Sequence, residues 1–314
     1  MDKLLKSLEL HLDDNRATQR TIDSFVLFIQ KLKSSRRVRF IYRGNSNLVE
    51  YYKTNTENLP LLAHYLFCLA DKGNYFYTNK TINIDNVFSL IWGIFHEKVI
   101  HKAFAQQKTI ERVSSFLSNN PEIEKYFSNI HNKRRFENLS KLPIDNKKNV
   151  ADYYLSILHT IGKSANGDSY FLSSSSKYNV ADRFKGEHNI IIFGWLPKKG
   201  MKNRIIKYTD VEKYSPFVKS LKLPTYQLPV YPEQSEICIK CGLLPHFILG
   251  FQHNNRFYIN PNTLKQWHDS IVYDGLDIDQ TEFNDLLNAT KLKQSFIFYD
   301  GNYYLISNKG KTEV

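Results

Sequence analysis

Three short segments carry side chains that together could break a bond to a sugar. Ile41-Tyr42-Arg43-Gly44 ends an apolar stretch in arginine, Ser173-Ser174-Ser175 follows an apolar pair, and Gln234-Ser235-Glu236 precedes another apolar run. Arginine binds phosphate groups, and a carboxylate stabilises the positive charge that develops on a sugar ring. Hydroxyl groups orient both partners. Together, side chains of these three types are suited to cleaving a glycosidic bond in a phosphate-bearing compound, although each segment alone is equally typical of a surface or a turn.

The elements expected around these segments are helices up to about residue 165 and mostly strands beyond it. Apolar spacing predicts helices over 3–33, 59–71, 84–107, 108–119, 121–131 and 150–162, with a basic linking loop over 132–149. Strands are predicted over 38–43, 169–175, 189–195, 203–207, 236–240 and 246–251, with a short helix over 180–185. Each candidate segment thus lies in or beside a predicted strand.

The last part of the chain contains two predicted hairpins. One joins 247–251 to 256–259, and the other joins 296–299 to 303–306 through an Asp300-Gly301 turn. Helices are expected between them, near 262–271 and 280–292. We expect 252–314 to form an appendage that helps to select a partner.

Composition limits the class of protein. The chain has 314 residues, of which 14% are aromatic, so a packed core is available and disorder is excluded. Three cysteines make no disulfide framework, and no secretory signal or membrane-length apolar run is visible, which favours the cytoplasm. The net charge of +12 is dispersed; a solvated surface explains it, and attraction to nucleic acid or to an acidic protein surface is the alternative.

The sequence lacks the spacing of the common zinc-binding and nucleotide-binding motifs. Cys238 and Cys241 form a single CxxC pair that cannot complete a four-ligand zinc site unless a histidine such as His246 joins. His96 and His101 are one residue too far apart to share the face of an α-helix as in HExxH sites. No glycine-rich phosphate loop is present, so we expect no metal and no Rossmann or Walker site.

The three segments resemble the motifs of the arginine-serine-glutamate class of mono-ADP-ribosyltransferases, which use NAD. Tyr42-Arg43-Gly44 is similar to the first motif, and Ser173-Ser174-Ser175 is similar to the Ser-Thr-Ser strand, with Ala181 and Phe184 at the offsets of the following helix. Gln234-Ser235-Glu236 is similar to the Gln-x-Glu form of the third motif. Arg36, Arg37 and Arg39 lie just upstream and are alternatives to Arg43 for the first motif. None of them is followed by glycine.

The resemblance implies an α+β fold: a split mixed β-sheet core with a large helical insertion and a C-terminal α/β appendage. Residues 1–251 would form the catalytic domain. Because Arg43 and Ser173 are far apart in the chain, about 59–160 would be the helical insertion. Residues 252–314 would form the appendage.

The resemblance also implies a role for each site residue. The catalytic residues would be Glu236, which stabilises the oxocarbenium ion, Gln234, which positions the acceptor, and Ser173, which hydrogen-bonds Glu236. NAD, the co-substrate, would contact Arg43, Gly44, Ser173, Ser175 and Phe184, although a core position is the favoured alternative for Phe184. The acceptor would be positioned by Gln234, Tyr231 and Tyr226.

The Gln-x-Glu form implies an acceptor other than arginine, such as the exocyclic amine of a nucleobase. Positive charge then favours nucleic acid, RNA before DNA, with a protein target next. The setting implied is a bacterial or phage toxin or defence effector that modifies RNA in the cytoplasm, restrained by an antitoxin or inhibitor protein. The alternatives are ADP-ribosylation of a protein side chain, an NAD glycohydrolase, and a basic nucleic-acid-binding protein without chemistry.

Overall fold

The computed structural model describes residues 19–34, 38–45, 62–63, 66–67, 71, 86–161, 171–197, 205–226, 232–240, 243, 247–254, 256–260, 294–299, 302–307 and 310–313. These residues form helices and antiparallel strands, as expected for an α+β protein. Contacts divide the chain into two units. Unit 1 comprises Met1–Thr78, Ser173–Arg204 and Gly242–Val314, and unit 2 comprises Asn79–Leu172 and Ile205–Cys241.

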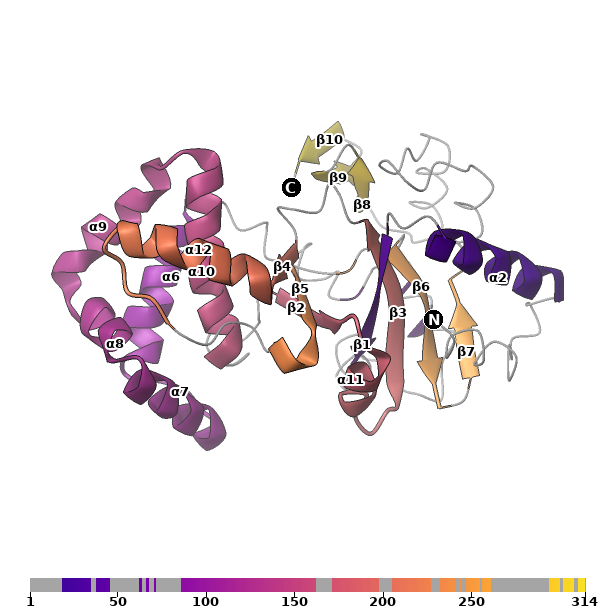
Figure 1. Cartoon of the computed structure of the whole chain (residues 1–314), viewed down its shortest axis with the longest axis horizontal. Coiled ribbons are helices and arrows are strands. Elements are labelled where there is room, and N and C mark those ends of the chain that lie inside the picture. The colour runs from indigo at the N-terminus through magenta and orange to yellow at the C-terminus, as the bar shows by residue number, and fades with distance from the viewer. Residues whose placement is uncertain are drawn as a thin grey trace. The chain divides into compact units, whose positions relative to one another are not determined.

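The described part of unit 1 is built mainly on one sheet, accompanied by the helices α2 and α11 (Figure 1). Its strands follow the order β2-β1-β3-β6-β7, and β1 is antiparallel to both of its neighbours. The register pairs Tyr42 with Ser175 on β2 and Arg43 with Ile192 on β3. The elements are α2 (Gln19–Ser34), β1 (Val38–Gly44), the end of β2 (Phe171–Ser175), α11 (Tyr178–Arg183), β3 (Ile190–Pro197), β6 (Ile248–His253) and β7 (Arg256–Ile259).

Helix α2 packs on this sheet through one apolar stripe. Phe25, Phe28, Ile29 and Leu32 recur at helical spacing and are fully buried. The ring of Phe25 lies 6.0 Å from that of Phe257 on β7. Burial of each such side chain contributes about 1.5–3 kcal/mol, so the stripe fixes which face of the helix meets the sheet.

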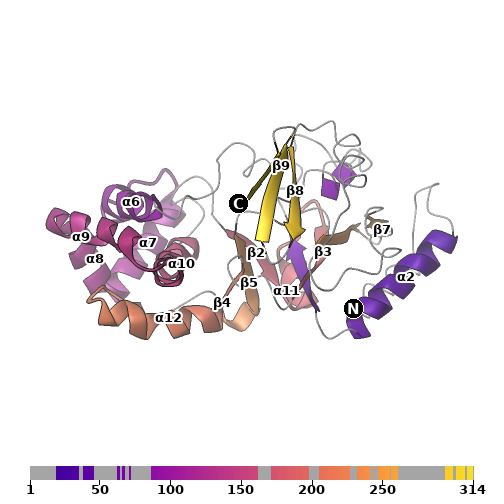
Figure 2. The same ribbon diagram turned by 90° about the horizontal axis from the view of Figure 1, so that it is seen from above.

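A second, three-stranded sheet of unit 1 lies at the end of the chain and is best seen in Figure 2. Its strands are β8 (Gln294–Tyr299), β9 (Asn302–Ser307) and β10 (Gly310–Glu313), in the order β10-β9-β8. Both expected hairpins are therefore present. The first one crosses the boundary expected at residue 252, because β6 and β7 belong to the same sheet as β1.

Unit 2 is mainly helical, and its helices gather in one group (Figure 2). An aromatic cluster fills the space between them: Phe95 stacks on Phe127 at 4.3 Å, and Phe136 meets Tyr154 at 5.1 Å. All four side chains are fully buried. The elements are α6 (Val87–Gly93), η1 (Ile94–Val99), α7 (Gln107–Asn119), α8 (Pro121–Ser128), η2 (Ile130–Asn132), α9 (Lys133–Glu137), η3 (Asn138–Lys141), α10 (Ile144–Ile161), β4 (Ile205–Lys207), α12 (Tyr208–Ser220), η5 (Pro232–Gln234) and β5 (Glu236–Lys240).

The structure corrects two sequence predictions in this unit. The basic loop expected over 132–149 is helical, because Phe136 and Leu139 are buried while the charged residues face solvent. Helix α12 was not predicted, because Pro216 lies inside it and interrupts the helical signal. The helices expected near 262–271 and 280–292 lie outside the described residues.

The residues of strand β2 are divided between the two units. Phe171 and Leu172 belong to unit 2, where β2 is next to β5 in the order β4-β5-β2, and Ser173 to Ser175 belong to unit 1.

None of the described helices combines the length and apolar character that a membrane span requires.

Candidate functional site

Arg43 lies at the end of β1 and is held on two sides. Its Nε donates to Oδ2 of Asp71 at 2.7 Å, and its Nη1 donates to the backbone carbonyl of Ser173 at 2.7 Å. Arg43 is 9% exposed and Asp71 is 1% exposed. Asn45 donates to the same carboxylate, with Nδ2–O distances of 3.2 and 3.4 Å. The guanidinium therefore has a fixed orientation, and it joins two segments that are 130 residues apart.

Gly44 follows Arg43 and lies against the backbone after α11. A Cβ atom at Gly44 would overlap the carbonyl oxygen of Ala181 and would lie 2.5 Å from the carbonyl carbon of Phe184 and 2.6 Å from Lys185 N. A side chain is thus excluded at this position. Phe184 itself is 51% exposed, so the core role favoured for it from the sequence is wrong. A glycine and an exposed aromatic ring consequently belong to one local structure beside Arg43.

The serine strand supplies both backbone and hydroxyl groups. Ser173 is partly buried, whereas Ser174 and Ser175 are buried. The Ser175 Oγ accepts a hydrogen bond from the backbone N–H of Lys177 at 3.0 Å, which fixes the turn into α11. Ser175 therefore has a structural role in unit 1.

Glu236 begins β5 in unit 2 and is buried, with its side chain 4% exposed. Its Oε1 shares a 3.0 Å hydrogen bond with Nε2 of His159, which lies in the last turn of α10. Cys238 is two residues further on β5, so its side chain is on the same face of the strand. Burial raises the pKa of the Cys238 thiol well above its usual value, and the neighbouring Glu236 adds to this effect.

Helix α10 also holds the segment that leads toward Glu236. The Tyr226 backbone N–H donates to the hydroxyl of Tyr153 at 2.9 Å, and the Tyr154 hydroxyl donates to the Pro224 carbonyl at 2.8 Å. The Tyr226 hydroxyl lies 3.0 Å from Ser156 Oγ, and burial raises the pKa of Tyr226. Tyr226 is therefore part of the core of unit 2, which corrects its assignment as an acceptor-positioning residue.

The remaining predicted site residues lie close to Glu236 in the chain. Gln234 ends the short helix η5 and is partly exposed. Ser235 has φ of 47°, so the backbone turns sharply between Gln234 and Glu236. Tyr231 lies outside the described residues. The structure thus places Arg43, Gly44, Ser173, Ser175 and Phe184 in unit 1, and Gln234, Glu236 and Tyr226 in unit 2.

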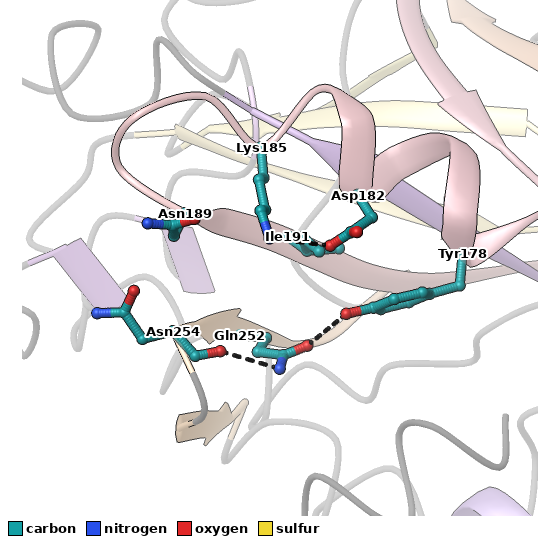
Figure 3. A pocket seen from close by; sticks show the side chains of 7 residues that line it. All are labelled: Tyr178, Asp182, Lys185, Asn189, Ile191, Gln252 and Asn254. Carbon is teal, nitrogen blue, oxygen red and sulfur yellow. Dashed lines mark hydrogen bonds and ion pairs between the residues drawn. The ribbon is translucent and has the colours of Figure 1, made fainter.

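A polar pocket of about 330 Å³ lies in unit 1 (Figure 3). Tyr178 points from α11 and donates to Gln252 Oε1 on β6 at 3.1 Å, and Gln252 Nε2 donates to the Asn254 carbonyl at 3.0 Å. Lys185 pairs with Asp182 at 3.2 Å in the same pocket. Tyr178 and Asp182 lie on α11, the helix whose end meets Gly44. The pocket therefore shares this element with the Arg43 region.

The residues that sequence reasoning missed are Asp71, His159 and the contact of Cys238 with Glu236. The sequence contained a signal for the contact of Cys238 with Glu236: the two residues are two positions apart on a predicted strand, so their side chains lie on the same face. Nothing in the sequence pairs Asp71 with Arg43 or His159 with Glu236.

The rings of His96 and His101 lie side by side, which the α-helical spacing did not predict. Residues Ile94–Val99 form a π-helix, with Ile100 N bonded to the Phe95 carbonyl at 2.9 Å. A π-helix brings residues five apart onto one face, and the two imidazole rings are 5.9 Å apart. The Nδ1–H of His96 donates to the Phe127 carbonyl at 2.8 Å, which attaches η1 to α8.

No protein-family model, curated protein or solved structure matches this chain.

Proposed function

We propose that this protein is an NAD-dependent mono-ADP-ribosyltransferase. The observation that carries the proposal is the 2.7 Å hydrogen bond from Arg43 to the backbone of Ser173. The motif resemblance requires these two segments to be neighbours, although the sequence separates them by 130 residues. This contact supports the proposal, because it brings the first two motifs together despite the long segment between them.

The local geometry supports a division of roles in unit 1. Asp71 and Ser173 orient the guanidinium of Arg43, whose Nη2 makes no hydrogen bond with the residues that the structure describes. The two N–H groups of that nitrogen are the proposed donors to the pyrophosphate of NAD. Gly44 lets the backbone approach the nicotinamide ring, and the exposed ring of Phe184 supplies an apolar surface for it.

Glu236 is the group that stabilises the reacting sugar. In the proposed reaction the bond from ribose C1′ to the nicotinamide nitrogen breaks, and nicotinamide leaves with the bonding electrons. The carboxylate of Glu236 stabilises the resulting oxocarbenium ion. A nucleophilic amine of the acceptor then bonds to C1′ and loses its proton to solvent. His159 keeps the carboxylate in one orientation through its 3.0 Å hydrogen bond.

The proposed acceptor is a nucleobase of RNA. The pocket beside α11 contains amide side chains from Asn189, Gln252 and Asn254, which offer both donors and acceptors to a base edge. Its volume of about 330 Å³ lies at the lower end of the range for small-molecule sites. The net charge of +12 favours a polyanionic partner. A toxin or defence role, with an antitoxin as restraint, follows from the resemblance alone.

Labelled NAD tests the reaction directly. The full-length protein is incubated with NAD labelled in the adenylate part and, separately, with RNA, DNA and cell protein. The expected result is label on RNA that is lost with Glu236→Gln, by about 100-fold or more. Glu233→Gln is the matched control, because Glu233 is exposed and lies in η5, three residues earlier. Equal loss in both variants, or full activity in Glu236→Gln, would refute the assigned site.

The same experiment separates the other functions. Label on protein alone would indicate a side-chain acceptor, and free ADP-ribose without transfer would indicate an NAD glycohydrolase. No turnover, combined with salt-sensitive binding of RNA that survives Glu236→Gln, would leave a nucleic-acid-binding protein. Gln252→Ala tests the pocket: we expect less label on RNA with unchanged NAD hydrolysis.

A further inference from the structure

Three side chains of types that bind metal ions lie close together inside unit 2. One ligand atom from each of His159, Glu236 and Cys238 is within 4.8 Å of the other two. The side chains of His159 and Glu236 are 8% and 4% exposed, and Cys238 is 1% exposed. A nitrogen, an oxygen and a sulfur ligand are thus gathered in a space from which most water is excluded.

The cluster is built on regular secondary structure. Glu236 and Cys238 are two positions apart on β5, so both side chains lie on the same face of the strand. His159 comes from the last turn of α10, and its ring meets the ring of Phe171 edge-on, with centroids 5.6 Å apart. The aromatic cluster of unit 2 holds α10 in place. The fold therefore brings the three ligands near one another before any ion binds, which lowers the cost of binding.

We infer that His159, Glu236 and Cys238 form a Zn²⁺ site. Zinc accepts imidazole, carboxylate and thiolate ligands, with bonds of about 2.0–2.3 Å in tetrahedral geometry. Tetrahedral ligands at these bond lengths are about 3.3–3.8 Å apart, so a cluster within 4.8 Å needs to contract by about 1 Å. Three protein ligands leave a fourth position for water, as in open zinc sites. The two anionic ligands neutralise the charge of the ion.

Zinc binding has a consequence for the proposed reaction, and this consequence rests on the proposed function. A carboxylate bonded to zinc is withdrawn from the ribose of NAD. The zinc-bound protein is then the inactive form, and a chelator activates it. The metal site itself does not depend on the reaction and is tested separately.

Cobalt spectroscopy of the full-length, chelator-treated protein tests the site. Co²⁺ replaces Zn²⁺ in such sites, and a thiolate bonded to Co²⁺ gives a charge-transfer band in the near ultraviolet, with visible bands that report tetrahedral geometry. We expect one equivalent of Co²⁺ to produce both, and Zn²⁺ to abolish them. Absence of the thiolate band from the wild-type protein overturns the proposal without reference to any variant.

Variants identify the ligands. Cys238→Ser should abolish the charge-transfer band, and His159→Gln or Glu236→Gln should weaken Co²⁺ binding by roughly tenfold or more. Cys68→Ser and Cys241→Ser are the matched controls and should retain the band. A band that survives Cys238→Ser, or that is lost with Cys241→Ser, would place the metal elsewhere. NAD turnover is measured in parallel: no turnover at any zinc concentration would overturn the proposed function and leave the cobalt result standing.

Discussion

The close approach of Gly44 to the backbone after α11 makes a sharp prediction for Gly44→Ala. The new methyl group would overlap the carbonyl oxygen of Ala181 and lie 2.5 and 2.6 Å from backbone atoms of Phe184 and Lys185. All three neighbours are backbone atoms, so no side chain can rotate away. Overpacking of this kind costs about 1–3 kcal/mol. With a urea m-value of about 2 kcal/mol per molar, the unfolding midpoint of unit 1 should fall by about 0.5–1.5 M.

Two other glycines provide matched controls. A Cβ at Gly250 would overlap the Tyr258 carbonyl oxygen and lie 2.7 Å from the Phe257 ring, so Gly250→Ala should destabilise the same unit. Gly93 lies in helix α6, and the nearest atom to its Cβ would be 4.0 Å away. Gly93→Ala should therefore stabilise unit 2 by about 0.5–1 kcal/mol, because alanine loses less backbone entropy in a helix.

Hydrogen exchange read by mass spectrometry across a urea series is the appropriate assay, because peptides from β1 and α10 report on the two units separately. NAD turnover is compared without urea, for variants whose circular dichroism shows that they are folded. We expect Gly44→Ala alone to lose turnover. A wild-type midpoint for Gly44→Ala would refute the close approach. Equal loss of turnover in folded Gly250→Ala would show that stability, and not the local site, explains the effect.

Three further predictions address the buried groups and the exposed ring. Asp71→Asn should destabilise unit 1 by about 3 kcal/mol in urea unfolding, because it leaves the charge of Arg43 buried without its carboxylate; an unchanged midpoint would contradict this. Burial raises the pKa of Tyr154 above its ordinary value, so the stabilisation it represents is complete below pH ~10 and is lost as pH rises through the folded pKa. Tyrosinate absorbance from this residue should therefore appear together with loss of helical circular dichroism, and tyrosinate formed in the intact helix would count against it. Phe184→Ala should raise the KM for NAD several-fold with a stability change below about 1 kcal/mol, whereas Leu27→Ala, which truncates an equally exposed side chain, should leave KM unchanged.

The strands of this protein were readable because their signal is local. The apolar-rich segment Val38 to Tyr42 predicts a strand and the Asp300-Gly301 pair predicts a hairpin, each from a few adjacent residues. Strand β1 and the paired strands β8 and β9 are present where expected. Helix α12 and the helices over 132–149 were not readable in the same way. Their buried positions are sparse, such as Val211 and Phe136, and packing against α10 and α6 stabilises them more than propensity does.

The site residues could be selected from the sequence, whereas their partners could not. Arg43, Ser173 and Glu236 were selected from the sequence by the resemblance of short motifs, which does not depend on the path of the chain. The partners of these residues could not be read from the sequence. Asp71 reaches Arg43 and His159 reaches Glu236 only through tertiary packing of elements that are distant in the chain.

Adjacent residues encode the strand that ends in Arg43-Gly44, the serine strand and the turn before Glu236, so each of these was predictable from the sequence. Other features depend on how distant elements pack: the contact of Arg43 with the backbone of Ser173, the exposure of Phe184, the burial of Tyr226, and the positions of His159 and Cys238 beside Glu236. The physical reason is that burial and hydrogen-bond partners depend on which elements pack together. That packing is set by the sum of many weak apolar contacts spread over the whole chain.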